Sequence, residues 1–306
     1  MPAPLIRRSN LLVPVRDIQA VQSASRSNTD AITLDLEDGI PEAHRPAARR
    51  MLGEAVTAAG RGGAEVFVRV NPDFIAEELE LAFSPALTGI VLPQVEDAEQ
   101  VLAAERLLSE LEKSRGIARS ALQIIVLLES ARAVWRVGDI LRSSQRISQA
   151  GLDESDLAAS MGIFTNADCD ALEYARGRLA VEAVAVGVQP ILLTRGMPER
   201  VINNEAVVPL AAHARSLGFR GLICPHPSWV EPVNAAMSPT AEQVAYYTEV
   251  RRVFAEAVAA GTAAAPLGKR MIDVPVDEWA AVVLETAAAC ARKDAEKKAA
   301  TTRVRD

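Results

Sequence analysis

Short apolar runs rich in β-branched residues alternate along the chain with longer segments whose apolar residues recur at helical spacing. This alternation is typical of repeated strand–helix units around a parallel sheet, an α/β fold. Eight runs qualify as strands, the number that closes a TIM (β/α)8 barrel. They lie at 10–15, 31–37, 64–71, 88–95, 122–129, 146–151, 189–194 and 219–226. The run at 146–151 is the weakest prediction because it is short and polar.

The segment 97–113 shows the helical pattern most clearly. Asp97 stands where a helix N-cap belongs, ahead of the apolar positions. The expected buried stripe consists of Val101, Leu102, Leu108 and Leu111.

The chain continues beyond the eighth run for longer than barrel closure requires. A helix is predicted at about 240–260, followed by a Gly/Ala/Pro-rich hinge at 261–270 and an Ala-rich helix from about 276. The stretch 292–306 is charged enough to be a frayed helix end or tail. We therefore expect a barrel over residues 1–260. Residues 261–306 would form a lid or oligomerisation extension with a charged tail.

Composition narrows the function by exclusion. The net charge of −7 disfavours nucleic-acid and membrane-surface partners, which are bound through concentrated basic faces. The first apolar run is shorter than a signal-peptide core and is broken by Pro14, and no run is long enough to span a bilayer. A cytoplasmic location is the expectation. Cys169, Cys224 and Cys290 are odd in number and far apart, so we expect buried thiols rather than disulfides or a zinc site.

Polar residues that end apolar runs are the candidates for chemistry, because β/α barrels build their active sites at the carboxyl ends of the strands. The second run ends in three carboxylates, Asp35, Glu37 and Asp38, which would repel one another without a nearby cation or arginine. Helix capping plus one surface acid is the alternative. Arg69 lies in a run suited to burial and needs an anionic partner, either Glu37, a substrate or both. A salt bridge that only braces the barrel is its alternative.

A metal site is predicted from the next strand ends. Glu129 ends the fifth run and Asp156 follows the sixth. Two carboxylates from successive strand ends, completed by water and substrate oxygens, usually hold Mg²⁺, and Mn²⁺ would be accepted too. Glu129 alone has a second explanation, as the first acid of the following helix. His226, between prolines after the eighth run, is at least as well explained by a turn as by a ligand or base.

Together these segments resemble the citrate lyase β-subunit-like group of the HpcH/HpaI aldolase superfamily over nearly the whole chain. The resemblance rests on RRSNLLVPV, AITLDLEDGIP, VFVRVN, GIVLPQVE, IIVLLES, DLAASMG, GLICPHPSWVEPVN followed by SPTAEQV, and KRMIDVPV, in this order. It implies a β/α barrel with an added C-terminal segment and dependence on Mg²⁺. It also implies substrates that are often coenzyme A thioesters of hydroxy acids, such as citryl-, malyl- or citramalyl-CoA.

The resemblance assigns roles at the barrel mouth position by position. Glu129 and Asp156 match the metal ligands. Arg69 matches the arginine that holds the substrate carboxylate. Glu37 and Asp38 match the acidic pair beside the metal.

The resemblance also gives the C-terminal extension a purpose. Asp273 matches an acid/base aspartate that related lyases often take from a neighbouring subunit, which implies a homo-oligomer, a trimer or hexamer. A helix N-cap is the alternative for Asp273. Arg7 or Arg8 would meet the phosphates of coenzyme A, although arginines this close to a terminus are commonly just solvated.

Three departures from the family pattern bear on the substrate. Gln94 stands where the family has a lysine, in PQVE for PKVE. The segment GLDESD is longer than the usual GxxD, which leaves Asp153 as a rival to Asp156 for the metal. QPILLTRG lacks the aspartate common after the seventh strand.

The reaction we expect is a reversible retro-aldol or Claisen-type cleavage of a hydroxy-acid derivative. Two alternatives remain. One is a class II aldolase acting on pyruvate or oxaloacetate without coenzyme A. The other is a barrel that binds metal and ligand without turnover.

Overall fold

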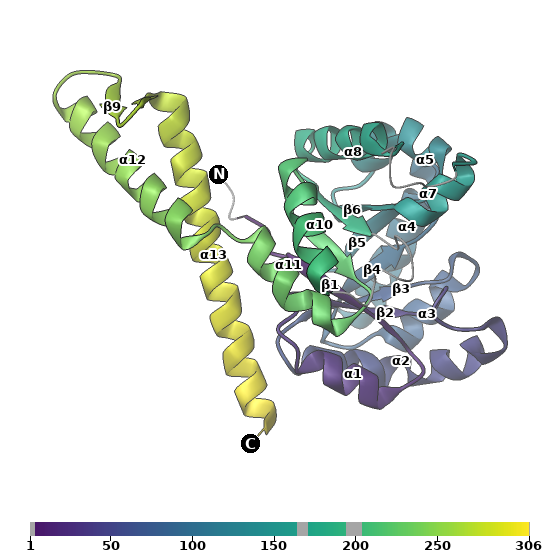
Figure 1. Ribbon diagram of the computed structural model, residues 1–306. Helices are drawn as coiled ribbons and strands as arrows, with labels where there is room; N and C mark the ends of the chain where they lie inside the picture. Colours follow the sequence, from purple (N-terminus) through teal and green to yellow (C-terminus); the bar gives the residue numbers. More distant parts are fainter. Residues whose placement is uncertain (1–3, 164–170, 194–203, 306) are drawn as a thin grey trace.

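Eight parallel strands close into a barrel in the computed structural model, which describes residues 4–163, 171–193 and 204–305 (Figure 1). The predicted α/β barrel is confirmed, and each predicted run overlaps the strand found there. The strands are β1 Ser9–Pro14, β2 Ala31–Asp35, β3 Glu65–Arg69, β4 Leu87–Leu92, β5 Gln123–Leu128, β6 Ile147–Asp153, β7 Gln189–Leu193 and β8 Gly221–Cys224.

Helices surround the barrel and shield the outer faces of its strands (Figure 1). They are α1 Ile18–Ser25, α2 Arg45–Gly60, α3 Ile75–Ala82, α4 Ala98–Arg115, α5 Ala131–Trp135, α6 Val137–Arg142, α7 Glu154–Ser160, α8 Glu173–Ala185, α10 Asn204–Ser216 and α11 Val230–Met237. Single 3-10 turns lie at Glu42–His44, Pro72–Phe74 and Pro227–Trp229. None of the helices that the structure describes has both the length and the apolarity needed to cross a membrane.

The helix predicted over 97–113 is α4, and it begins as expected. Asp97 caps it and forms a capping box with Gln100. The stripe is nearly as predicted, except that Leu102 is only half-buried and Ala104 takes a buried position instead. The period of the pattern was therefore right, and the centre of the buried face is rotated slightly from the prediction.

The barrel interior explains why the chemistry gathers at its mouth. Its inner residues are Ala31, Phe67, Val91, Ile125, Leu127, Ile191, Leu193 and Ile223. Side chains alternate along a strand, so Arg69 shares the inner face of β3 with Phe67. Glu129 likewise continues the inner row of Ile125 and Leu127 just beyond β5. Arg69 and Glu129 therefore lie at the carboxyl end of the barrel, directly above the apolar residues that fill its interior.

An arm follows α11 and leaves the barrel (Figure 1). It consists of α12 Ala241–Ala259, the antiparallel hairpin of β9 Ala265–Leu267 and β10 Arg270–Ile272, and α13 Val274–Arg305. The segment 261–270, predicted to be a hinge, therefore forms part of a hairpin. α12 and α13 pack together around a small core of Val250, Ile272 and Ala280.

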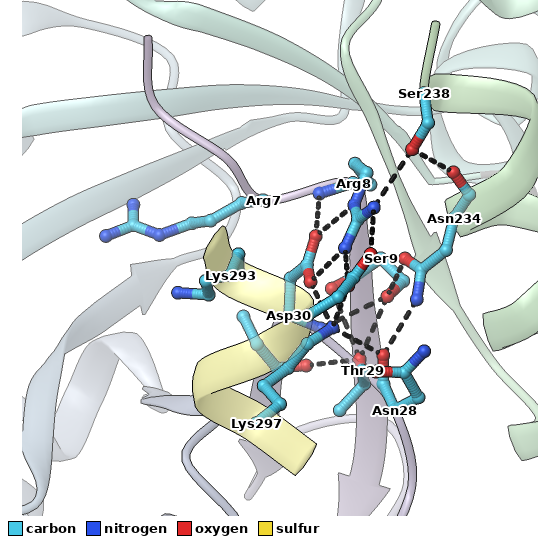
Figure 2. A network of polar contacts seen from close by, with 12 residues as sticks. Arg7, Arg8, Ser9, Asn28, Thr29, Asp30, Asn234, Ser238, Lys293 and Lys297 are labelled. Carbon is cyan, nitrogen blue, oxygen red and sulfur yellow. Dashed lines mark hydrogen bonds and ion pairs between the residues drawn. The ribbon is translucent and has the colours of Figure 1, made fainter. Parts of the chain in front are cut away.

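The last part of α13 returns to the barrel and packs where β1 and β2 begin, at the amino-terminal end. Lys297 is 1% exposed and donates to Asp30 at 2.5 Å. Arg8 donates to both oxygens of Asp30, at 2.7 and 2.9 Å, and to Asp294 at 2.5 Å. Figure 2 shows Arg8 and Lys297 meeting on Asp30. The stretch predicted to be a frayed end or tail is thus helical and holds buried ion pairs.

Replacing Lys297 by methionine is expected to lower the free energy of unfolding by about 3 kcal/mol, because it leaves part of the charge of fully buried Asp30 without a partner. Lys298→Met is the matched control, since Lys298 is exposed. Urea denaturation of both variants checks this. Equal stability of the two variants would show that the network contributes little to holding α13.

Candidate functional site

A cavity of about 600 Å³ opens at the carboxyl end of the barrel, where the predicted site was expected. Its lining residues come from the loops and first helical turns that follow β2, β4, β5 and β6. They are Asp38, Gln94, Glu96, Gln100, Glu129, Ser130 and Asp156. Four of the seven are carboxylates, so the lining favours binding of a cation, or of a ligand that is coordinated to a cation.

Three carboxylates converge at this mouth. Oxygens of Glu129, Asp153 and Asp156 all lie within 4.8 Å of one another. Asp153 ends β6 and caps α7, accepting from the backbone N–H groups of Ser155 at 3.1 Å and Asp156 at 3.4 Å. Asp156 follows in the first turn of α7 and is exposed. Asp153 and Asp156, the two alternatives for the second metal ligand, therefore belong to one cluster. They lie close together because Asp153 caps α7 and Asp156 is in the first turn of that helix.

The electrostatics of Glu129 suit a divalent cation. Burial raises the pKa of Glu129 to about 8, and repulsion from Glu37, Asp153 and Asp156 adds to the shift. Its Oε1 atom is buried and has no hydrogen-bond partner among the residues that the structure describes. A hard cation would satisfy that oxygen and remove the repulsion. The all-oxygen donor set fits Mg²⁺, or Mn²⁺, better than a softer metal.

Arg69 lies beside this cluster, held by a partner that the sequence analysis did not assign to it. Asp35 is its register neighbour across β2 and β3. Nε and Nη2 of Arg69 donate to the two oxygens of Asp35, both at 2.7 Å. Burial alone would lower the pKa of Arg69, but these bonds outweigh it and raise that pKa. Arg69 therefore keeps its charge although it is 1% exposed.

The other edge of the guanidinium faces the mouth. Nη1 of Arg69 lies 3.1 Å from Asp38 and 3.2 Å from Glu37. The Asp38 side chain is 41% exposed, whereas that of Glu37 is 5% exposed. An incoming carboxylate would reach Nη1 by displacing Asp38, the member of the pair that water already solvates. The predicted pairing of Arg69 with Glu37 is present but is the weaker contact.

Gln94 links the two halves of the site. Its side chain donates to Glu37 at 2.7 Å, and its backbone N–H favours the ionised form of Glu129 and so lowers the pKa of that carboxyl. Its φ of 55° lies in the left-handed region, which is uncommon outside glycine and marks a constrained backbone. Burial raises the pKa of Glu37 to about 7, against the attraction of Arg69. Gln94 carries no charge, so it leaves the pKa of Glu37 raised. A lysine at this position would lower the pKa of Glu37 through its positive charge.

Magnesium affinity is expected to depend on pH in a direction set by Glu129. A cation binds the ionised carboxylate, so it must displace the proton that Glu129 holds below a pH of about 8. Affinity should fall by up to about tenfold per pH unit as the pH drops below that value. Metal affinity thus rises with pH, whereas the stability of the metal-free protein should fall as the pH rises from 4.5 to about 8. In this range the folded state keeps a proton on Glu129 that the unfolded state releases. Titration calorimetry and thermal melts across this range test both slopes, and a flat affinity profile would contradict the assignment.

Arg8 is not part of the mouth of the barrel. It precedes β1 and so lies at the amino-terminal end, opposite Glu129, and its charge is neutralised by Asp30 and Asp294. Arg7 is equally buried and paired with Glu65. We therefore leave both arginines out of the proposed substrate site.

Asp273 lies on the arm, directly after β10. It is exposed, and its side chain accepts from the backbone N–H of Val276 at 3.3 Å at the start of α13. The hairpin of the arm lies away from the barrel (Figure 1). Within one chain the arm therefore does not bring Asp273 to the acidic cluster.

Other predicted features have structural roles. His226 caps the turn at Pro227–Trp229, accepting from Ser228, as expected of a turn residue. Cys224 and Cys290 are buried, and burial raises the pKa of Cys224 to about 12. Cys169, and Thr194 onward in QPILLTRG, lie outside the described residues.

Comparison with known proteins adds four findings. The family model described as HpcH/HpaI aldolase/citrate lyase matches residues 8–227. The chain is 25% identical over 292 residues to citrate lyase subunit beta of Haemophilus influenzae, covering 94% of this chain and 99% of that protein. It is 26% identical over 310 residues to L-malyl-CoA/beta-methylmalyl-CoA lyase of Rhodobacter capsulatus, covering 94% and 96%. The crystal structure of CitE from Mycobacterium tuberculosis with magnesium, acetoacetate and coenzyme A aligns with a TM-score of 0.71 at 26% identity, covering 92% and 97%.

Proposed function

Because the chain belongs to the HpcH/HpaI aldolase/citrate lyase family, we propose that it is a Mg²⁺-dependent carbon–carbon lyase acting on a hydroxy-acyl-CoA. The substrate would be of the citryl-, malyl- or citramalyl-CoA type. The observation that carries the proposal is the convergence of Glu129, Asp153 and Asp156 beside the mouth-facing edge of Arg69. Relatives named as citrate lyase and malyl-CoA lyase support the reaction class, and the related CitE crystal structure supports magnesium and coenzyme A as ligands.

The metal would be held by Glu129 and Asp156, with Asp153 within reach as a third ligand. When bound, Mg²⁺, or Mn²⁺ in its place, supplies Lewis-acid chemistry at the oxygens of the keto-acid half. Arg69 would grip the same carboxylate through Nη1, which fixes the orientation of the breaking bond. The substrate carboxylate would displace Asp38 from Nη1 of Arg69. Glu37, kept beside Arg69 by Gln94, would tune the charge there.

Cleavage requires proton movements that this chain's own residues would perform. The substrate hydroxyl loses its proton and becomes the keto oxygen, the carbon–carbon bond breaks, and its electron pair forms the enolate of the thioester half. That enolate then takes up a proton. We assign the acid/base role to Asp273, reaching the mouth from the arm of a neighbouring subunit. The hairpin of the arm lies away from the barrel of its own chain, which supports this assignment. We propose with it a homo-oligomer, a trimer or hexamer, located in the cytoplasm.

The test is a substrate panel with Mg²⁺ and with excess chelator. Citryl-, malyl- and citramalyl-CoA should each release acetyl-CoA and the matching keto acid only when metal is present. Free hydroxy acids cleaved in preference to the thioesters would favour the class II aldolase. Retained Mg²⁺ binding with no cleavage of any panel member would favour a barrel that binds without turnover.

A further inference from the structure

A second cavity lies at the other end of the barrel, between its floor and α13. Its volume is about 230 Å³. Its lining comes from the segment before β1, the segment before β8, the end of α11 and the first half of α13. Arg8 precedes β1 and Arg220 precedes β8, so this cavity is remote from the mouth where Glu129 lies. The proposed reaction makes no use of it.

The walls of this floor cavity are mainly apolar and come from two separate parts of the fold. Phe219 and Met237, both buried, belong to the barrel side. Trp279, Val282 and Val283 belong to α13. Ligand pockets for drug-sized molecules usually measure roughly 300–1,000 Å³. The floor cavity is smaller, which suits a short alkyl chain.

The charge of the lining is one-sided. Four of the described lining residues are arginines and none is a carboxylate, in a chain whose net charge is −7. Arg7 and Arg8 are already neutralised by ion pairs. Among the described residues, Arg215 donates to the backbone carbonyls of Ala236 and Ser238, at 2.8 and 2.7 Å, which carry no charge.

Arg220 supplies the second uncompensated charge. It is exposed, and no carboxylate pairs with it or with Arg215 in the part of the chain that the structure describes. Two guanidinium groups beside an apolar cavity offer both halves of a site for an amphipathic anion, since a guanidinium matches the fork of a carboxylate. A cation would be repelled, and an uncharged chain would leave the arginines unused.

We propose that the floor cavity binds a small monocarboxylate with a short alkyl chain. The chain would lie between Phe219 and the valines of α13, and the carboxylate would pair with Arg220 and Arg215. An occupant held by both walls would join α13 to the barrel and raise the melting temperature, as any ligand of the folded state does. This site is independent of the metal and of the proposed lyase reaction.

The first test uses hexanoate as the probe with the full-length, metal-free protein. Calorimetry should give saturable binding at one site per chain. Acetate should bind at least about tenfold more weakly because it lacks the buried methylenes. Hexylammonium, which has the chain but the opposite charge, should not bind. Equal binding of hexylammonium and hexanoate, or no saturable hexanoate binding, would overturn the proposal.

Variants then locate the site. Arg220→Ala should weaken hexanoate binding about tenfold, the effect of losing a charge-assisted contact, whereas exposed Arg119→Ala, the same change outside the lining, should not. Val283→Trp should fill the cavity and abolish binding without changing Mg²⁺ affinity, which shows that the variant is folded. The proposal is wrong if Arg119→Ala matches Arg220→Ala, or if Val283→Trp still binds. A changed oligomeric state in Val283→Trp would assign the cavity to a second copy of the chain and would equally overturn it.

Discussion

Replacing Glu129 by glutamine is expected to abolish Mg²⁺ binding and, with it, lyase activity. Glutamine keeps the shape of the side chain but removes the charge that the cation needs, and Glu129 is the most buried donor of the cluster after Asp153. Loss of a positioned metal ligand typically removes several orders of magnitude of rate, because the developing charge is then unsupported. Calorimetry with Mg²⁺ and a single-substrate assay measure the two losses.

The same substitution should leave the metal-free protein at least as stable as the parent. Burial and three neighbouring carboxylates already disfavour a charge at Glu129, so a neutral amide relieves the repulsion. The melting temperature above about pH 8 should therefore rise or stay level. Glu96→Gln is the matched control, since Glu96 lines the same cavity but lies outside the cluster. Loss of metal binding in Glu96→Gln as well would point to the general charge of the mouth rather than to one ligand.

Asparagine at position 273 is expected to lower kcat about 10²–10⁴-fold while Mg²⁺ affinity stays unchanged. Asparagine caps a helix as well as aspartate does, so this change separates proton transfer from the cap on Val276. Exposed Glu278→Gln, one turn further along α13, should retain full activity. An Asp273→Asn variant with full kcat would restrict Asp273 to its capping role.

Mixing two inactive variants tests where Asp273 acts. In assemblies that combine Glu129→Gln chains with Asp273→Asn chains, some mouths would have an intact Glu129 and receive an intact Asp273 from the neighbour. Random mixing of equal amounts should restore activity at up to about a quarter of the sites in a head-to-tail ring. If each chain used its own Asp273, every site would lack one group and no activity would return.

Much of the site followed from the sequence because it depends on local order. A polar residue that ends a strand of a parallel barrel must lie at the mouth, which located Arg69, Glu129 and Asp156. The partner of Arg69 was missed because the choice between Asp35 and Glu37 depends on the register between β2 and β3. Side-chain alternation could not have found it, because Asp35 and Glu37 are two residues apart and alternation assigns both to the same face of the strand.

The position of Arg8 and the packing of residues 292–306 were harder to predict from the sequence. Arg8 precedes the first strand, and that order alone would have placed it at the floor rather than the mouth. Its contact with Asp294 joins residues 286 positions apart, which no periodicity encodes. Three charges of the stretch expected to be a tail, those of Lys293, Asp294 and Lys297, are paired with residues of the barrel. A sequence shows such charges but not their partners, so it favours a solvated end.

One helix connects the hairpin of the arm to the floor of the barrel. α13 has 32 residues and is roughly 48 Å long at about 1.5 Å per residue. Each residue also turns the helix by about 100°, so distance and direction along it are fixed together. Inserting a single residue between Trp279 and Cys290 would swing Asp273 about a quarter of the way round the axis while Lys297 stayed anchored. The helical phase of α13 thus sets the direction in which the arm presents its aspartate.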